Sequence, residues 1–101
     1  MDKPTLKQIT AEAERVTDAA WEKLGGQVTD PDALREVVLA LDGVKDSLMA
    51  AAETANLQEC HELGAMYRAT LDLQSKVLLR IHEVELVLAA NAIFAAKQRL
   101  H

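Results

Sequence analysis

The feature that most constrains this chain is an unbroken 3-4 spacing of apolar residues in its middle third. The residues that follow this spacing are Leu34, Val37, Leu41, Val44, Leu48, Ala51 and Ala55. An α-helix turns once in 3.6 residues, so residues spaced alternately by three and four lie along one face. Such a seam packs against neighbouring helices. The spacing therefore predicts a helix over residues 31–55 that is buried along one side.

Local signals mark the start of this helix clearly and its end poorly. Thr29 or Asp30 can accept a hydrogen bond from the first turn, and Pro31 fits that turn because it lacks an N–H. At the other end, Asn56 and Gly64 are both candidates for the turn. Without a turn, residues 31–100 would form a rod about 105 Å long. We therefore expect a turn between residues 54 and 64.

The same spacing predicts a helix on either side of this one. A first helix is expected over residues 4–24, with Pro4 in its first turn and Gly25-Gly26 ending it. A third helix is expected over residues 58–100. The apolar residues near one face of its first half are Leu63, Tyr67, Thr70, Val77, Ile81, Val84 and Leu88.

Composition favours an all-α fold built as one domain over residues 1–101. The chain has only four glycines, two prolines and three aromatic residues, which suits helices packed through small aliphatic side chains better than a sheet. We expect the second and third helices to form a long antiparallel hairpin. The shorter first helix would pack on this hairpin, with coiled-coil-like bundle packing.

The segment 86–96 does not follow the amphipathic pattern, because it is apolar on every face except at Asn91. A helix that is apolar all round must be covered all round, and two shorter helices cannot cover all of it. The segment is therefore predicted to dock on another protein chain, although it could also be the core of the domain. A polar residue in an apolar seam can fix register or oligomeric state, or lie at its wet edge. The predicted partner-binding residues are Leu86, Leu88, Asn91, Ile93 and Phe94.

Charge and motifs argue against several classes of function. The net charge is −5, whereas nucleic-acid binding needs clustered basic residues, so no nucleic-acid partner is expected. The acidic excess lies in residues 31–56, which hold five acidic and two basic side chains. No glycine loop precedes a Lys-Ser or Lys-Thr pair, and no Ser or Cys sits in a nucleophile motif. We expect no catalytic residues, no cofactor and no enzymatic activity.

Cys60 and His61 form the one cluster that suggests metal or redox chemistry, with His82, Glu83 or Glu85 as further ligands. Helical metal sites place ligands three or four residues apart, whereas adjacent residues point about 100° apart. We therefore predict no metal site. A single cysteine permits no internal disulfide, so a cytoplasmic location is expected. No run of about 18 apolar residues is present, so a membrane partner is not expected either.

Together these features predict a non-enzymatic protein–protein interaction protein, such as a small adaptor, an assembly or secretion chaperone, or a structural subunit. Its partner would be a second copy, completing a bundle as a homodimer, or a helical partner chain. Two alternatives remain open. One is a metal- or redox-responsive small regulator that uses Cys60 and His61, and the other is a peripheral membrane-associated helical protein.

Overall fold

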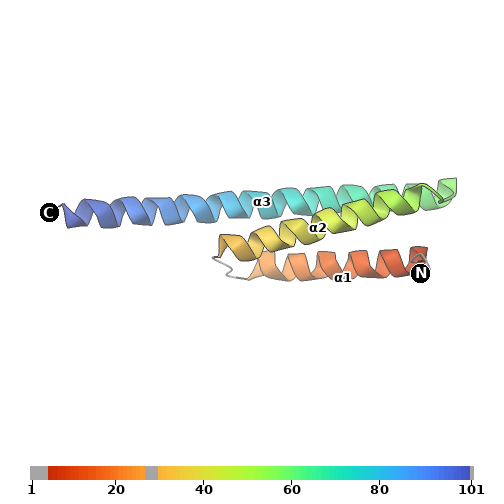
Figure 1. Cartoon of the computed structure of the whole chain (residues 1–101), viewed down its shortest axis with the longest axis horizontal. Helices are drawn as coiled ribbons and strands as arrows, with labels where there is room; N and C mark the ends of the chain where they lie inside the picture. The colour runs from red at the N-terminus through yellow and green to blue at the C-terminus, as the bar shows by residue number, and fades with distance from the viewer. Residues whose placement is uncertain (1–4, 27–29, 101) are drawn as a thin grey trace.

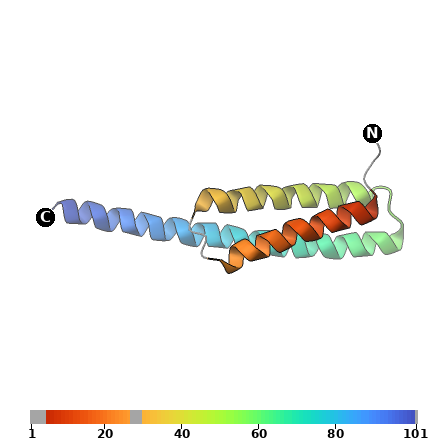
Figure 2. The same cartoon turned by 90° about the horizontal axis from the view of Figure 1, so that it is seen from below.

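The computed structural model describes residues 5–26 and 30–100, and within them it contains three α-helices and no strand (Figure 1). The helices are α1 (Leu6–Gly25), α2 (Pro31–Ala52) and α3 (Leu57–Arg99). α1 and α3 run in the same direction and α2 runs opposite to both (Figures 1 and 2). The expected all-α fold, with an antiparallel α2–α3 hairpin and a shorter first helix packed on it, is confirmed.

The first helix begins at Leu6, two residues after the predicted start. Thr5 caps it, because its Oγ1 accepts a hydrogen bond from the Gln8 N–H at 3.2 Å. The Gln8 side chain completes a capping box by accepting a hydrogen bond from the Thr5 N–H at 2.8 Å. Pro4 lies outside the described residues. The Thr-x-x-Gln pattern therefore marks the start of α1.

The turn between α2 and α3 lies at Asn56. Asn56 Oδ1 accepts a hydrogen bond from the Glu59 N–H at 2.9 Å, and Glu59 Oε1 accepts one from the Asn56 N–H at 3.0 Å. This capping box marks the start of α3. The preceding helix, α2, ends at Ala52, three residues before its predicted end. Gly64 lies inside α3. At the other end of α2, Asp30 is the cap and accepts a hydrogen bond from the Asp32 N–H at 3.0 Å; Thr29 lies outside the described residues.

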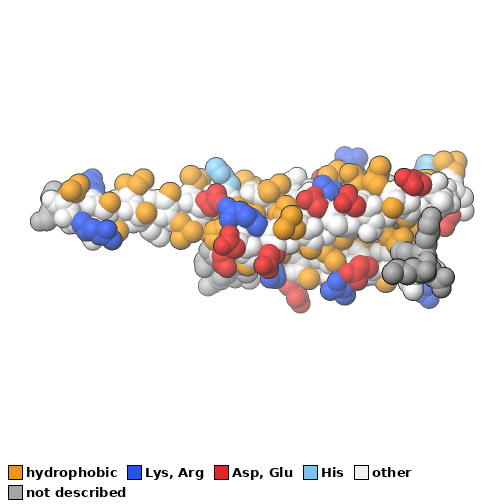
Figure 3. All heavy atoms as spheres, viewed as in Figure 1, with side chains coloured by type: hydrophobic (Ala, Val, Ile, Leu, Met, Phe, Trp, Pro, Cys, Tyr) orange, Lys and Arg blue, Asp and Glu red, His pale blue; other side chains and the backbone are white. Residues whose placement is uncertain are grey.

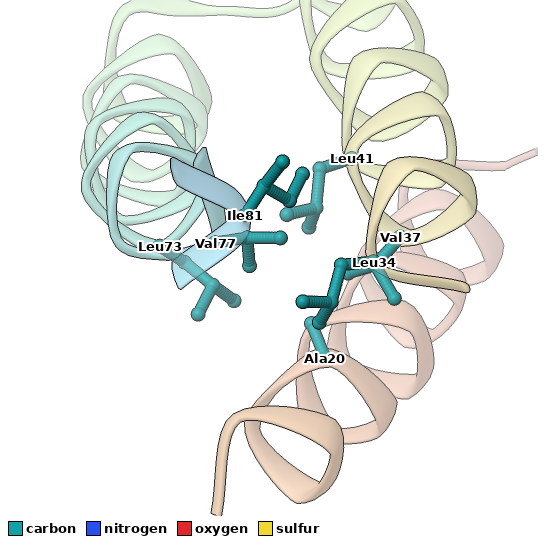
Figure 4. Packing of buried hydrophobic residues seen from close by; sticks show 7 residues of the cluster. All are labelled: Ala20, Leu34, Val37, Leu41, Leu73, Val77 and Ile81. Carbon is teal, nitrogen blue, oxygen red and sulfur yellow. The ribbon is translucent and has the colours of Figure 1, made fainter. Parts of the chain in front are cut away.

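The core is a row of small aliphatic side chains between the three helices. Leu34, Val37, Leu41, Val44 and Leu48, the predicted seam of α2, are all buried. Near the α1–α2 connection the core consists of Ala20, Leu34, Val37, Leu41, Leu73, Val77 and Ile81 (Figure 4). Toward the α2–α3 turn it continues through Ala13, Val44, Leu48 and Leu63. No described residue of the core is aromatic.

A buried polar contact connects α2 and α3. Gln74 is 7% exposed, and its Nε2 donates to Asp42 Oδ1 at 2.7 Å and to the Val38 carbonyl at 3.1 Å. A buried amide is stable only where it finds such partners. Sliding α2 along α3 would break both hydrogen bonds, so Gln74 fixes the register of the hairpin.

The Asp42 contact should make stability depend on acidity. The hydrogen bond from Gln74, and then Lys45 at 3.1 Å, hold the pKa of Asp42 below its ordinary value of 3.8. Ionised Asp42 therefore stabilises the fold above that value, and this contribution is lost as pH falls through the lowered pKa. We expect the difference in unfolding free energy between the wild type and Asp42→Asn to shrink from about pH 5 to about pH 2.

Urea denaturation at several pH values measures this difference. Asp46→Asn, which removes an exposed carboxylate of the same helix, is the control for the loss of one negative charge. A difference for Asp42→Asn that stays constant over the whole pH range would contradict the prediction.

Candidate functional site

α3 is about twice as long as its neighbours, and its C-terminal part leaves the bundle. It has 43 residues, whereas α2 has 22 and α1 has 20. The molecule measures 67 × 25 × 20 Å, and its long axis is set by α3 (Figures 1 and 2). Two contacts lie near the place where α3 extends beyond the other helices. Arg80 donates a hydrogen bond to the Leu24 carbonyl at 3.1 Å, and Arg35 forms an ion pair with Glu85. Residues 86–100, here called the projecting segment, are all exposed.

The five residues predicted to bind a partner all lie on the projecting segment. Leu86 is 57% exposed, Leu88 49%, Ile93 69% and Phe94 62%, and Asn91 is also exposed. These side chains therefore do not form the core of the single chain, which was the other explanation for their sequence pattern. They do not share one face either, because successive residues of a helix are rotated by about 100°.

Two apolar stripes run along opposite sides of the projecting segment. The front stripe continues the line of the buried residues Val77 and Ile81. Its residues are Val84, Leu88, Asn91, Ala95 and Gln98, with Val87 and Phe94 beside them. The back stripe lies about half a turn away and also keeps the 3-4 spacing. Its residues are Leu79, His82, Leu86, Ala89, Ile93, Ala96 and Leu100.

The front stripe begins in a shallow groove where α3 leaves the bundle. The groove is lined by Arg80, Glu83, Val84, Val87, Leu88 and Asn91. Its floor is apolar, while two charged side chains and one amide stand at its edge. Apolar surface with a few polar groups at the rim is typical of a protein-docking site. The groove thus gives Leu88 and Asn91 a common location, whereas Leu86 and Ile93 lie on the other side of the helix.

Charge is distributed unevenly along the exposed part of α3. Glu83 and Glu85 lie at the base of the projecting segment, and Lys97 and Arg99 lie at its tip. In Figure 3 the charged side chains near the free end are basic, whereas acidic and basic side chains both lie over the bundle. Between these two ends, residues 86–96 carry no charge. The segment is therefore an apolar rod with two carboxylates at its base, each beside an arginine, and two basic side chains at its tip.

Cys60 and His61 do not join the other candidate metal ligands. They lie in the first turns of α3, and His82 is 22 residues further along the same helix, or about 33 Å away. Within residues 5–26 and 30–100, no three His, Cys, Asp or Glu side chains lie close enough to hold a metal ion. The half-buried Cys60 thiol instead lies 3.7 Å from the carbonyls of Ala52 and Ala55, at the end of α2.

The sequence analysis does not predict Val84 and Val87 of the groove, or Leu79, Ala89, Ala96 and Leu100 of the back stripe, as binding residues. The signal for them is present in the sequence, because both stripes keep an unbroken 3-4 spacing. It was obscured because a segment that is apolar all round shows no single periodic face. The structure separates the two stripes by showing that only one of them continues the core.

Comparisons with known proteins give no match: no family model fits the chain, and neither a curated protein nor a solved structure resembles it significantly. A search of the described helices finds none that is long and apolar enough to cross a membrane. The class that the fold and the site define is thus a three-helix bundle that extends one helix, apolar on both sides, into solvent.

Proposed function

We propose that this chain is a non-catalytic protein–protein interaction protein that docks on another helical chain through its projecting segment. The observation that carries the proposal is the exposure of large apolar side chains along one uncovered helix. Their exposed fractions range from 49% at Leu88 to 86% at Leu100. Exposed apolar patches of this extent mark interaction sites on soluble proteins.

The shape of the segment indicates the kind of partner. Its helical part, residues 86–99, has 14 residues and is about 21 Å long, with an apolar stripe on each side. A second helix laid along either stripe would cover several large side chains at once, as in helix-in-groove recognition. Each large apolar side chain that is fully buried in this way contributes about 1.5–3 kcal/mol. A partner helix that packs along the projecting segment would therefore bury its exposed apolar side chains.

The other functional classes have less support. A membrane-surface helix usually carries a broad basic face, whereas the only basic side chains of the projecting segment are Lys97 and Arg99 at its tip. The single cysteine supports a reducing, cytoplasmic setting as part of the proposal. Roles as an adaptor, an assembly chaperone or a structural subunit all use the same docking surface.

The double variant Leu88→Asp, Ile93→Asp tests the proposal, because it places one charge on each stripe. We expect it to abolish binding to any helical partner, including self-association, since a charge buried without a partner is strongly unfavourable. Light scattering on the purified chain and co-purification from native extract measure the loss. Asp46→Lys changes the charge of an exposed bundle residue and should bind as the wild type does. Equal association of the wild type and the double variant in both measurements would refute the proposal.

A further inference from the structure

We propose that the back stripe binds the back stripe of a second copy of this chain. The two projecting segments would lie antiparallel, related by a two-fold axis near the level of residue 91. This inference rests on the proposed function, since it names the partner for one side of the same surface. Three observations carry it: the positions of the charges, the sizes of the facing side chains and the free space around the stripe.

The charges beside the back stripe are self-complementary. Glu85 and Arg99 lie along one side of the stripe, and Glu83 and Lys97 lie along the other. A two-fold axis between antiparallel helices sets each side next to the same side of the partner, in reversed order. Glu85 then faces the partner's Arg99, and Glu83 faces the partner's Lys97. Because the symmetry repeats each contact, the dimer contains four intermolecular ion pairs.

The same alignment matches large residues with small ones in the middle of the overlap, while His82 lies opposite the partner's Leu100 at each end. Leu86 lies opposite the partner's Ala96, and Ile93 lies opposite the partner's Ala89. Alanine allows the two helices to approach closely, and the larger side chain fills the space above it. Ala90 and Ala92, the residues beside the centre, are also small. The charges therefore select this register, and the side-chain sizes are compatible with it.

Other alignments lose the ion pairs. Sliding the helices by seven residues toward the bundles would bring Lys97 level with the partner's Lys76 and separate the four ion pairs. A parallel pair would place the two acidic bases side by side and the two basic tips side by side. Like charges held together in this way are unfavourable. The antiparallel register near residue 91 is the one that pairs opposite charges at both ends.

The surroundings leave room for the partner helix. The back stripe points away from Leu73, Val77 and Ile81, which are buried against α1 and α2. Glu85 already pairs with Arg35, and Glu83 lies 4.0 Å from Arg80. Their side chains are still 44% and 60% exposed, and each carboxylate has two oxygens that can accept further donors.

The overlap of residues 82–100 is about 27 Å, or five helical turns. An interface between two single helices of this length is small compared with stable obligate dimers. We therefore expect a dimer of 22.2 kDa, twice the chain mass of 11.1 kDa, that dissociates on dilution. The front stripes of the two copies stay open in this arrangement.

A charge-swap experiment tests the pairing. The acidic-tip variant is Lys97→Glu, Arg99→Glu, the basic-base variant is Glu83→Lys, Glu85→Lys, and the full swap carries all four substitutions. Each exposed ion pair contributes a factor of about 2 to 3. Losing four pairs should therefore raise the dissociation constant of either two-residue variant about 30-fold at low salt. The full swap, and an equimolar mixture of the two variants, should return to within about threefold of the wild type.

Two double variants, one on each side of the projecting segment, show which stripe forms the dimer interface. Leu86→Asp, Ile93→Asp on the back stripe should leave a monomer at every concentration. Leu88→Asp, Phe94→Asp on the front side should dimerise as the wild type does. Light scattering over a dilution series measures the mass, and circular dichroism verifies that each variant keeps its helices.

The outcomes separate this inference from the proposed function. A wild type that stays monomeric, or a full swap that binds no better than the acidic-tip variant, would overturn the antiparallel dimer. Loss of association in the front variant alone would also overturn it, but would leave the projecting segment as a docking surface for another chain. If neither apolar variant changes self-association or partner capture, both the inference and the proposed function are wrong.

Discussion

Replacing Leu41 by alanine should lower the free energy of unfolding by about 3 kcal/mol. Leu41 lies in the middle of α2, is fully buried, and packs in the cluster with Leu34, Val77 and Ile81 (Figure 4). Removing its side chain leaves a cavity that a row of small aliphatic residues fills poorly, because no large ring nearby can move into the space. A domain of this size has a total stability of about 5–15 kcal/mol. For a domain of this size, a loss of about 3 kcal/mol lowers the melting temperature by roughly 12–24 °C.

Leu39→Ala is the matched control, since it removes the same atoms from the same helix two residues away. Leu39 is 68% exposed, so its truncation should change stability by less than about 0.5 kcal/mol. Urea denaturation at one fixed protein concentration measures both variants and keeps any effect of self-association constant. If Leu39→Ala and Leu41→Ala lower the free energy of unfolding equally, the face of α2 that carries Leu41 is not the buried face.

The arrangement of the helices could be predicted because one face of each helix repeats every 3.6 residues. The seam from Leu34 to Leu48 indicates both the helix and its buried side, and Asp30 and Pro31 mark its start. The position of the α2–α3 turn could not be chosen, because Asn56 and Gly64 offered equivalent signals. The capping box of Asn56 and Glu59 decides it. Such a box was a readable pattern at both Thr5 and Asn56, and it defines helix starts more sharply than a lone glycine does.

The candidate site was harder to predict, because composition alone does not show where a helix leaves its bundle. Whether Leu86 and Phe94 are core or surface depends on how far α2 reaches along α3, and that depends on the register. Gln74 fixes the register through Asp42 and Val38, yet a glutamine in a helical pattern looks like any surface residue. Once the register is set, residues 86–100 are exposed, and the two stripes become distinct.

Deleting residues 87–101 should remove association while leaving the bundle intact. The deletion removes Ile93 and Leu100 from the back stripe and Leu88 from the front stripe, and each contributes about 1.5–3 kcal/mol when it is buried at an interface. Binding to a second copy or to another helical chain should therefore weaken by at least about 100-fold. Light scattering and partner capture measure this loss.

The free energy of unfolding of the shortened chain should stay within about 1 kcal/mol of the full-length value under conditions where both are monomeric. Every described core residue lies at or before Ile81, and the ion pair of Arg35 with Glu85 is kept. Fraying of the new helix end near Val84 accounts for the small change that is expected. A large fall in stability would instead mean that the projecting segment folds back on its own bundle. The full-length variant Leu88→Asp, Ile93→Asp is the control for association, since it keeps the helix and changes only its apolar surface. If this variant still associates while the shortened chain does not, the length of α3 determines binding, and its apolar stripes do not.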